Sequence, residues 1–106
     1  MSGFSRISAN DAKQLIDESG AVIADIRDER SFDMGHIPGA VKIDNTNVQQ
    51  FITDADLDKP LIVCCYHGNM SQSGASFFAQ HGFTKTYSLD GGFSGWSMLF
   101  PDRIER

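Results

Sequence analysis

Apolar residues along the chain occur in two patterns, short unbroken runs and positions spaced as on one face of a helix. The runs at 21–26 and 61–64 are typical of strands that are buried on both faces. Shorter apolar stretches at 40–43 and 85–89 predict two further strands. The segments between them predict helices, which are expected at 9–19, 31–34, 47–53, 71–81 and after 92.

Two of these helices have recognisable features. The first is expected to begin after Ser8, whose hydroxyl can cap free N–H groups, and to end at Gly20. On the helix at 71–81, the positions expected to share one face are Gly74, Phe77, Phe78 and His81.

Strands that alternate with helices predict an α/β fold, in which a central parallel sheet is flanked by helices on both faces. The 106 residues suffice for one core, so a single domain over 1–106 is expected. Parallel sheets bind ligands at the carboxyl ends of their strands. The loop that follows Cys64 is the segment that best fits such a site.

Charge and hydropathy narrow the class of function. The formal net charge of −5 disfavours nucleic-acid binding, which normally needs an excess of Lys and Arg. The densest charge, at 27–30, is mixed in sign and is expected to be a solvated turn. No apolar run approaches the roughly 20 residues that span a bilayer, and residues 1–10 lack the apolar core of a signal peptide. A cytoplasmic protein without membrane contact is therefore expected.

The two cysteines, Cys64 and Cys65, are adjacent in the sequence and cannot form a disulfide that joins distant segments. Cys64 continues an apolar strand and is expected in the core. Cys65 begins a loop in which Gly68 lets the backbone turn several N–H groups inward, and a helix N-terminus follows. A thiol in that setting has a lowered pKa and is partly thiolate, so Cys65 is the candidate nucleophile.

Three sequence blocks resemble the signatures of one family. Residues 65–71, Cys-Tyr-His-Gly-Asn-Met-Ser, resemble the active-site loop of the rhodanese family. Residues 22–27 with 35–40 are similar to its N-terminal signature, and Asp-Gly-Gly-Phe-x-x-Trp at 90–96 is similar to its C-terminal one. The blocks occur in family order, and the resemblance extends over nearly the whole chain.

The resemblance implies a small rhodanese-like domain that acts as a thiosulfate sulfurtransferase. Cys65 would take a sulfur atom from thiosulfate as a persulfide and pass it to cyanide or to a dithiol such as reduced thioredoxin. This chemistry requires neither a metal nor an organic cofactor. The residues expected to contact the substrate are Tyr66, His67, Gly68, Asn69, Met70 and Ser71.

The loop departs from the family pattern at two positions. Tyr66 and Met70 stand where many members carry arginine, so affinity for a dianion must come from backbone dipoles or from bases elsewhere. His67 is either a cationic helper that lowers the pKa of Cys65 or an exposed histidine that lends only an N–H. Asn69 is expected to tolerate an unusual backbone angle rather than to touch the substrate.

Other signature residues are expected to be structural. Asp25 and Arg27 are predicted to pair at the end of the first long strand. His36 is expected to be a structural histidine whose ring nitrogens are hydrogen-bonded within the fold. Residues 90–92 are expected to form a turn that starts a helix, and Phe93 and Trp96 are expected in the core.

Two other classes of function remain as alternatives. A related fold serves phosphatases and arsenate reductases, but that chemistry needs an arginine six residues after the cysteine, where this chain has Ser71. Rhodanese-like domains also serve as non-catalytic binding modules, and a persulfide carrier for a specific partner lies between that class and the enzyme. A zinc site is not predicted, because Cys64, Cys65 and His67 lie close together in the sequence and no second cluster of possible ligands accompanies them.

Overall fold

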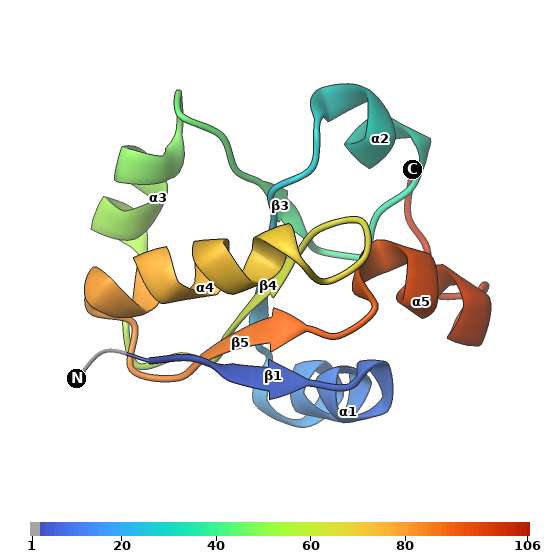
Figure 1. The fold of residues 1–106 in the computed structure, drawn as a ribbon, viewed down its shortest axis with the longest axis horizontal. Helices are drawn as coiled ribbons and strands as arrows, with labels where there is room; N and C mark the ends of the chain where they lie inside the picture. Colours follow the sequence, from blue (N-terminus) through green and yellow to red (C-terminus); the bar gives the residue numbers. More distant parts are fainter. Residues whose placement is uncertain (1–2) are drawn as a thin grey trace.

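A five-stranded parallel sheet forms the centre of the computed structural model, which describes residues 3–106 (Figure 1). Its strand order is β1-β5-β4-β2-β3. The strands are β1 (Ser5–Ile7), β2 (Val22–Asp25), β3 (Val41–Lys42), β4 (Leu61–Cys64) and β5 (Thr86–Leu89). The helices are α1 (Ala9–Ser19), α2 (Glu29–Met34), α3 (Val48–Asp54), α4 (Met70–Gln80) and α5 (Gly92–Leu99). The predicted fold class is confirmed.

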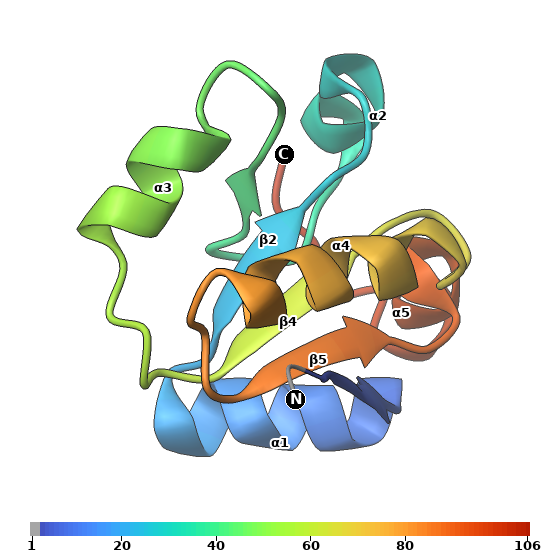
Figure 2. The same cartoon turned by 60° about the vertical axis from the view of Figure 1, so that its left-hand side comes forward.

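The two faces of the sheet carry separate hydrophobic cores. Figure 2 shows helices on either side of the sheet. Ile62 and Cys64 of β4 point toward α1 and α5, whereas Leu61 and Val63 point toward α3 and α4. The alternation follows from the pleat of the strand, which sends successive side chains to opposite faces. All four side chains of β4 are buried, which explains why the strand consists of apolar residues. The predictions of a doubly covered strand and of a core Cys64 are confirmed.

Strand β1 is absent from the elements that the sequence predicts. It is three residues long and lies at the sheet edge, where Ser5, Arg6 and Ile7 pair with residues of β5. Only one of the three is apolar, so no hydrophobic pattern marks the segment. Pairing with β5, more than 80 positions away in the chain, makes it a strand.

Helices α1 and α4 can both be compared with their predictions. The Ser8 side chain accepts a hydrogen bond from the Asp11 N–H, and Gly20 closes α1 with φ 62°. On α4 the rings of Phe77 and His81 lie on one face, as predicted, with 4.2 Å between their centroids, but both side chains are exposed. The buried positions of α4 are Ser71, Ala75, Phe78 and Ala79.

The charged segment at 27–30 is not the predicted solvated turn. Arg27 is buried, Asp28 caps the N-terminus of α2, and the helix itself begins at Glu29. Among residues 3–106, no helix is long and apolar enough to cross a membrane.

Candidate active site

Cys65 lies directly after β4, at the carboxyl edge of the sheet, as predicted. Its side chain is buried, and its Sγ accepts hydrogen bonds from the backbone N–H groups of Gly68 and Ser71, each at 3.2 Å. The loop from Cys65 to the start of α4 therefore folds around the sulfur atom, with N–H groups pointing inward. Such a ring of donors binds a thiolate or another anion without any charged side chain.

Gly68 supplies the bend in this loop, as expected from the sequence. Its φ is +93°, and a Cβ there would lie 2.9 Å from the Gly91 nitrogen, closer than packed atoms approach. The unusual backbone angle predicted for Asn69 is wrong. Asn69 has φ −87° and ψ −55°, ordinary helical values, because Gly68 alone reverses the chain before α4 begins.

The N-terminus of α5 holds the same loop from the other side. The Phe93 N–H donates to the Cys65 carbonyl at 2.8 Å, and the Ser94 N–H donates to the Tyr66 carbonyl at 3.0 Å. The backbones meet at Gly92, where φ is +57° and a Cβ would lie 2.5 Å from both carbonyl oxygens. Because α5 binds the carbonyls, the loop is fixed with its N–H groups free to face the sulfur.

The sequence pattern predicted correctly that residues 90–92 start a helix. It did not predict that this helix start contacts the Cys65 loop. The available signal was the pair Gly91-Gly92, since two consecutive glycines at a helix start indicate a close backbone approach.

The environments of the two thiols differ sharply. Burial alone would raise the pKa of Cys65, but hydrogen bonds from the Ser71 hydroxyl and from the N–H groups of Ser71, Gly68 and His67 lower it overall. Burial raises the pKa of Cys64 far above its usual range, and the neighbouring Asp25 charge adds to this effect. Cys64 is therefore a neutral core thiol, and Cys65 is the one whose thiolate is stabilised.

Ser71 contributes to the site in two ways. Its N–H and hydroxyl both act on the Cys65 sulfur, and its side chain is fully buried. Its Oγ also lies 2.8 Å from the Oγ of Ser88 on β5, so the strand next to β4 fixes the hydroxyl.

The other loop side chains are exposed to solvent. His67 and Asn69 are exposed, and Met70 is 66% exposed at the first position of α4. The Tyr66 hydroxyl bonds to the Asp28 carboxylate and to the Ser31 hydroxyl, which ties the loop to α2. The bonds to Tyr66 and Ser31 lower the pKa of Asp28 to about 2.

Asp25 and Arg27 form the predicted pair at the end of β2. Their side chains are almost completely buried, and Arg27 Nη2 lies 2.8 Å from Asp25 Oδ2. The same Nη2 donates to the Gly35 carbonyl at 2.8 Å, and the guanidinium packs on the ring of Phe93. The pair thus joins β2, the end of α2 and the start of α5 around the carboxyl edge of the sheet.

His36 is a scaffold residue, as predicted. Its Nδ1 lies 2.8 Å from the Phe32 carbonyl oxygen, and its ring stacks on the Phe32 ring at 3.8 Å between centroids. Its backbone pairs with Glu105, near the end of the chain. Trp96 is fully buried, whereas Phe93 is only partly buried and lies beside the candidate site.

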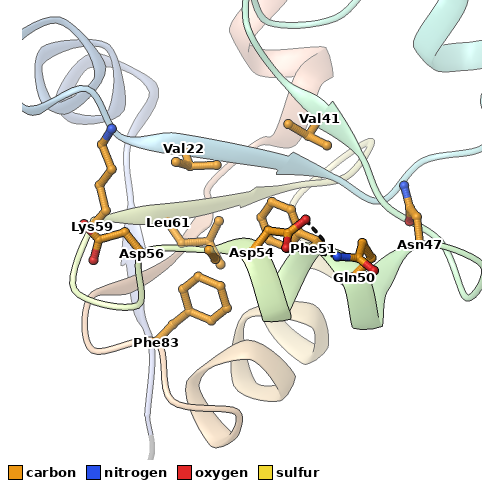
Figure 3. A pocket seen from close by; sticks show the side chains of 11 residues that line it. Val22, Val41, Asn47, Gln50, Phe51, Asp54, Asp56, Lys59, Leu61 and Phe83 are labelled. Carbon is orange, nitrogen blue, oxygen red and sulfur yellow. Dashed lines mark hydrogen bonds between the residues drawn. The ribbon is translucent and has the colours of Figure 1, made fainter.

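A cavity of about 470 Å³ lies between α3 and the first residues of β2 and β4 (Figure 3). Val22 and Leu61, the first residues of β2 and β4, line it together with Phe51 and Phe83. It is therefore at the amino edge of the sheet, opposite the loop that follows β4. In the described part of the chain, no cluster of three or more His, Cys, Asp or Glu side chains is placed to hold a metal ion.

A cysteine thiolate held by backbone N–H groups, at the carboxyl edge of a parallel sheet, defines a class of proteins that use a sulfur nucleophile on anionic substrates. Within that class, the rhodanese-like domain model matches residues 8–99, and the chain belongs to this family.

Curated relatives cover nearly the whole chain. It is 55% identical over 101 residues to the thiosulfate sulfurtransferase GlpE of Ectopseudomonas mendocina, covering 95% of this chain and 92% of that protein. It is 51% identical to the thiosulfate sulfurtransferase GlpE of Pseudomonas fluorescens, with coverages of 98% and 94%. The fold is similar to that of a rhodanese-related protein from Thermoplasma volcanium, with a TM-score of 0.76, 24% identity, and coverages of 91% and 93%.

Proposed function

We propose that this protein is a thiosulfate sulfurtransferase in which Cys65 carries the sulfur as a persulfide. The observation that supports this most directly is the Cys65 Sγ with two backbone N–H donors at 3.2 Å and a lowered pKa. The relatives named thiosulfate sulfurtransferase, which align over nearly the whole chain, support thiosulfate as the donor.

The proposed reaction has two displacements. The Cys65 thiolate attacks the outer sulfur of thiosulfate, the S–S bond of thiosulfate breaks, and sulfite leaves with the electron pair. An acceptor nucleophile then attacks the outer sulfur of the persulfide, and Cys65 leaves as the thiolate. No oxidant or reductant is consumed, because one S–S bond is exchanged for a new bond to sulfur in each step.

The loop N–H groups suit both steps. Cys65 must be a thiolate as nucleophile and again as leaving group, and donors fixed in advance stabilise that charge without reorganisation. Thiosulfate, sulfite and the persulfide are also anions. We propose that the loop residues Tyr66, His67, Gly68, Asn69, Met70 and Ser71 contact the substrate, chiefly through their backbone.

Affinity for thiosulfate is expected to be weak. The loop itself has no arginine, and the charge of Arg27, at the same edge of the sheet, is already paired with Asp25. His67 is exposed and can approach a bound anion. If it acts there as a cation, the pH–rate profile of His67→Ala should differ from that of the parent protein. A micromolar Michaelis constant for thiosulfate would contradict this reasoning.

We propose that the acceptor is cyanide in the assay and a dithiol such as reduced thioredoxin in the cell. We still expect the protein to be cytoplasmic. A persulfide carrier for one partner, or a non-catalytic binding module, is the alternative. A phosphatase is disfavoured because Ser71 occupies the position where that chemistry needs arginine.

The test is the intact mass of the reduced protein before and after exposure to thiosulfate. We expect a gain of one sulfur atom that is absent in Cys65→Ser and is removed by cyanide. The matched control is Cys64→Ala, which should keep full loading and lose only about 1 kcal/mol of stability through a small cavity. A folded protein that gains no sulfur would favour the binding module instead.

A further inference from the structure

A second cavity lies beside the candidate active site, between α2, the Cys65 loop and the start of α5. Its volume is about 280 Å³. Cys65 is not part of its wall, so it is distinct from the ring of N–H groups that holds the sulfur. The residues that line it are Arg27, Ser31, Met34, Gly35, Tyr66 and Phe93.

The guanidinium of Arg27 lies among the residues that line this cavity. Three of the other lining residues contact that group. The Gly35 carbonyl accepts from Nη2 at 2.8 Å, and the Cζ atom lies 4.3 Å from the Phe93 ring centroid and 5.8 Å from that of Tyr66. A planar cation placed against two aromatic rings leaves its edge as the polar surface of the cavity.

One nitrogen of this guanidinium is without a partner. Nε and Nη2 donate to Asp25 and Gly35, whereas Nη1 makes no hydrogen bond to any of residues 3–106. The Arg27 side chain is only 3% exposed. Every completely inaccessible side-chain nitrogen or oxygen in that range has a partner, so Nη1 keeps some accessible surface, and Arg27 is one of the residues that line the cavity. A guanidinium N–H that has no protein partner and keeps some accessible surface can donate a charge-assisted hydrogen bond to an incoming oxygen atom.

The chemistry around Nη1 favours an uncharged acceptor over an anion. Asp25 already neutralises Arg27, so a carboxylate would add one uncompensated negative charge. The Asp28 carboxylate, bound to the hydroxyls of the lining residues Tyr66 and Ser31, would repel that charge further. Because one edge of the fork is occupied by Asp25, Nη1 offers room for a single oxygen rather than a bidentate group.

We propose that this cavity binds a small uncharged molecule that carries a carbonyl oxygen on a short apolar body. The oxygen accepts from Arg27 Nη1, and the body packs against the rings of Tyr66 and Phe93 and the side chain of Met34. Phe93 and Tyr66 also hold the Cys65 loop, so the ligand lies against the elements that shape the active site.

The test follows the side-chain ¹⁵N–H resonances of Arg27 during titration with three probes that share an isopropyl group, namely isobutyramide, isobutyrate and isobutylamine. We expect saturable shifts with the amide, weaker ones with the carboxylate, and none with the amine. No shift with the amide, or tighter binding of the carboxylate, would overturn the proposal. The readout is binding alone, so it is independent of whether the protein transfers sulfur.

Two exposed methionines give matched variants for the same titration. Met34 lines the cavity and is 68% exposed, whereas Met98 is 82% exposed and lies outside it. Because both side chains are largely solvated, either change should leave the fold intact. Met34→Ala should weaken isobutyramide binding several-fold, and Met98→Ala should leave it unchanged. Equal affinities in the two variants would place the probe elsewhere and refute the assignment.

Discussion

The contact between α5 and the Cys65 loop makes Gly92→Ala a sharp test of how the site is held. A Cβ at position 92 would lie 2.5 Å from the carbonyl oxygens of Cys65 and Tyr66, and the backbone there has φ +57°. Both neighbours are backbone atoms, so no side-chain rotation relieves the overlap. Helix α5 must move away from the loop, and the hydrogen bonds from Phe93 and Ser94 lengthen or break.

The expected loss follows from two terms. An L-residue in the left-handed region costs about 1–2 kcal/mol. Each broken backbone hydrogen bond costs about 0.5–1.5 kcal/mol. Gly92→Ala should therefore lower the free energy of unfolding by about 2–5 kcal/mol, measured by urea denaturation.

Gly95→Ala is the matched control in the same helix. The nearest atom to a Cβ at position 95 is the Asp90 carbonyl oxygen, 4.0 Å away, and the backbone has no positive φ. An alanine in a helix interior is favoured over glycine by about 0.5–1 kcal/mol, so this variant should be slightly more stable than the parent.

A second readout separates loss of the loop geometry from general destabilisation. The rate of Cys65 alkylation by iodoacetamide is measured against pH under conditions where each variant is folded. Once the loop is released, the N–H groups of Gly68 and Ser71 hold the thiolate less well, so the midpoint should move to higher pH in Gly92→Ala only. An unchanged midpoint, together with a loss of stability below about 0.5 kcal/mol, would refute the role given to α5.

Three further predictions concern the thiolate and the buried ion pair. Ser71→Ala removes a hydroxyl that lowers the pKa of Cys65, so the alkylation midpoint should rise. Ser88→Ala breaks the same Ser71–Ser88 contact without removing that hydroxyl, and an equal rise there would contradict the assignment. Because the pKa of Cys65 is lowered by folding, its ionisation stabilises the protein fully above the unfolded pKa, about 8.5, and this contribution is lost as pH falls through the folded pKa. The unfolding free energy should therefore rise with pH over that window in a Cys64→Ala background, which removes the opposing thiol, and should stay flat once Cys65 is also replaced by serine. Asp25→Asn leaves a buried guanidinium without its charge partner and should lower the free energy of unfolding, measured by urea denaturation, by about 3–5 kcal/mol. A loss below about 1 kcal/mol would mean that the Arg27 guanidinium becomes hydrated in the variant.

The parts of the fold that follow from sequence are those whose signal is local. The apolar run 61–64 identifies β4, because only a strand covered on both faces has no polar position. Ser8 and Gly20 mark the ends of α1, because capping depends on residues within one turn of the helix end. The Asp25–Arg27 pair is also local, since the partners are two positions apart.

The local signals failed where a tertiary contact decided the outcome. Phe77 and Phe78 are adjacent and equally apolar, yet only Phe78 faces the sheet, because the side chain of Phe77 points about a quarter of a turn away from it. Strand β1 exists only through its pairing with β5. Asn69 needed no special angle once Gly68 had made the turn.

The sequence by itself determined the chemistry of the candidate site. Cysteine is the residue with the nucleophilic sulfur, Gly68 gives the loop its bend, and the order of strand, loop and helix places backbone donors near that sulfur. These properties depend on residues within seven positions of one another, from Cys65 to Ser71.

Only the tertiary structure decided how that loop is held and what lies beside it. The bonds from Phe93 and Ser94 to the loop, the Ser88 contact to Ser71, and the tie from Tyr66 to α2 join positions 17 to 38 apart. No local pattern encodes such contacts, because they form only when the sheet brings the ends of β2, β4 and β5 to one edge. The free Nη1 of Arg27 has the same origin, since its cavity exists only where α2, the loop and α5 meet.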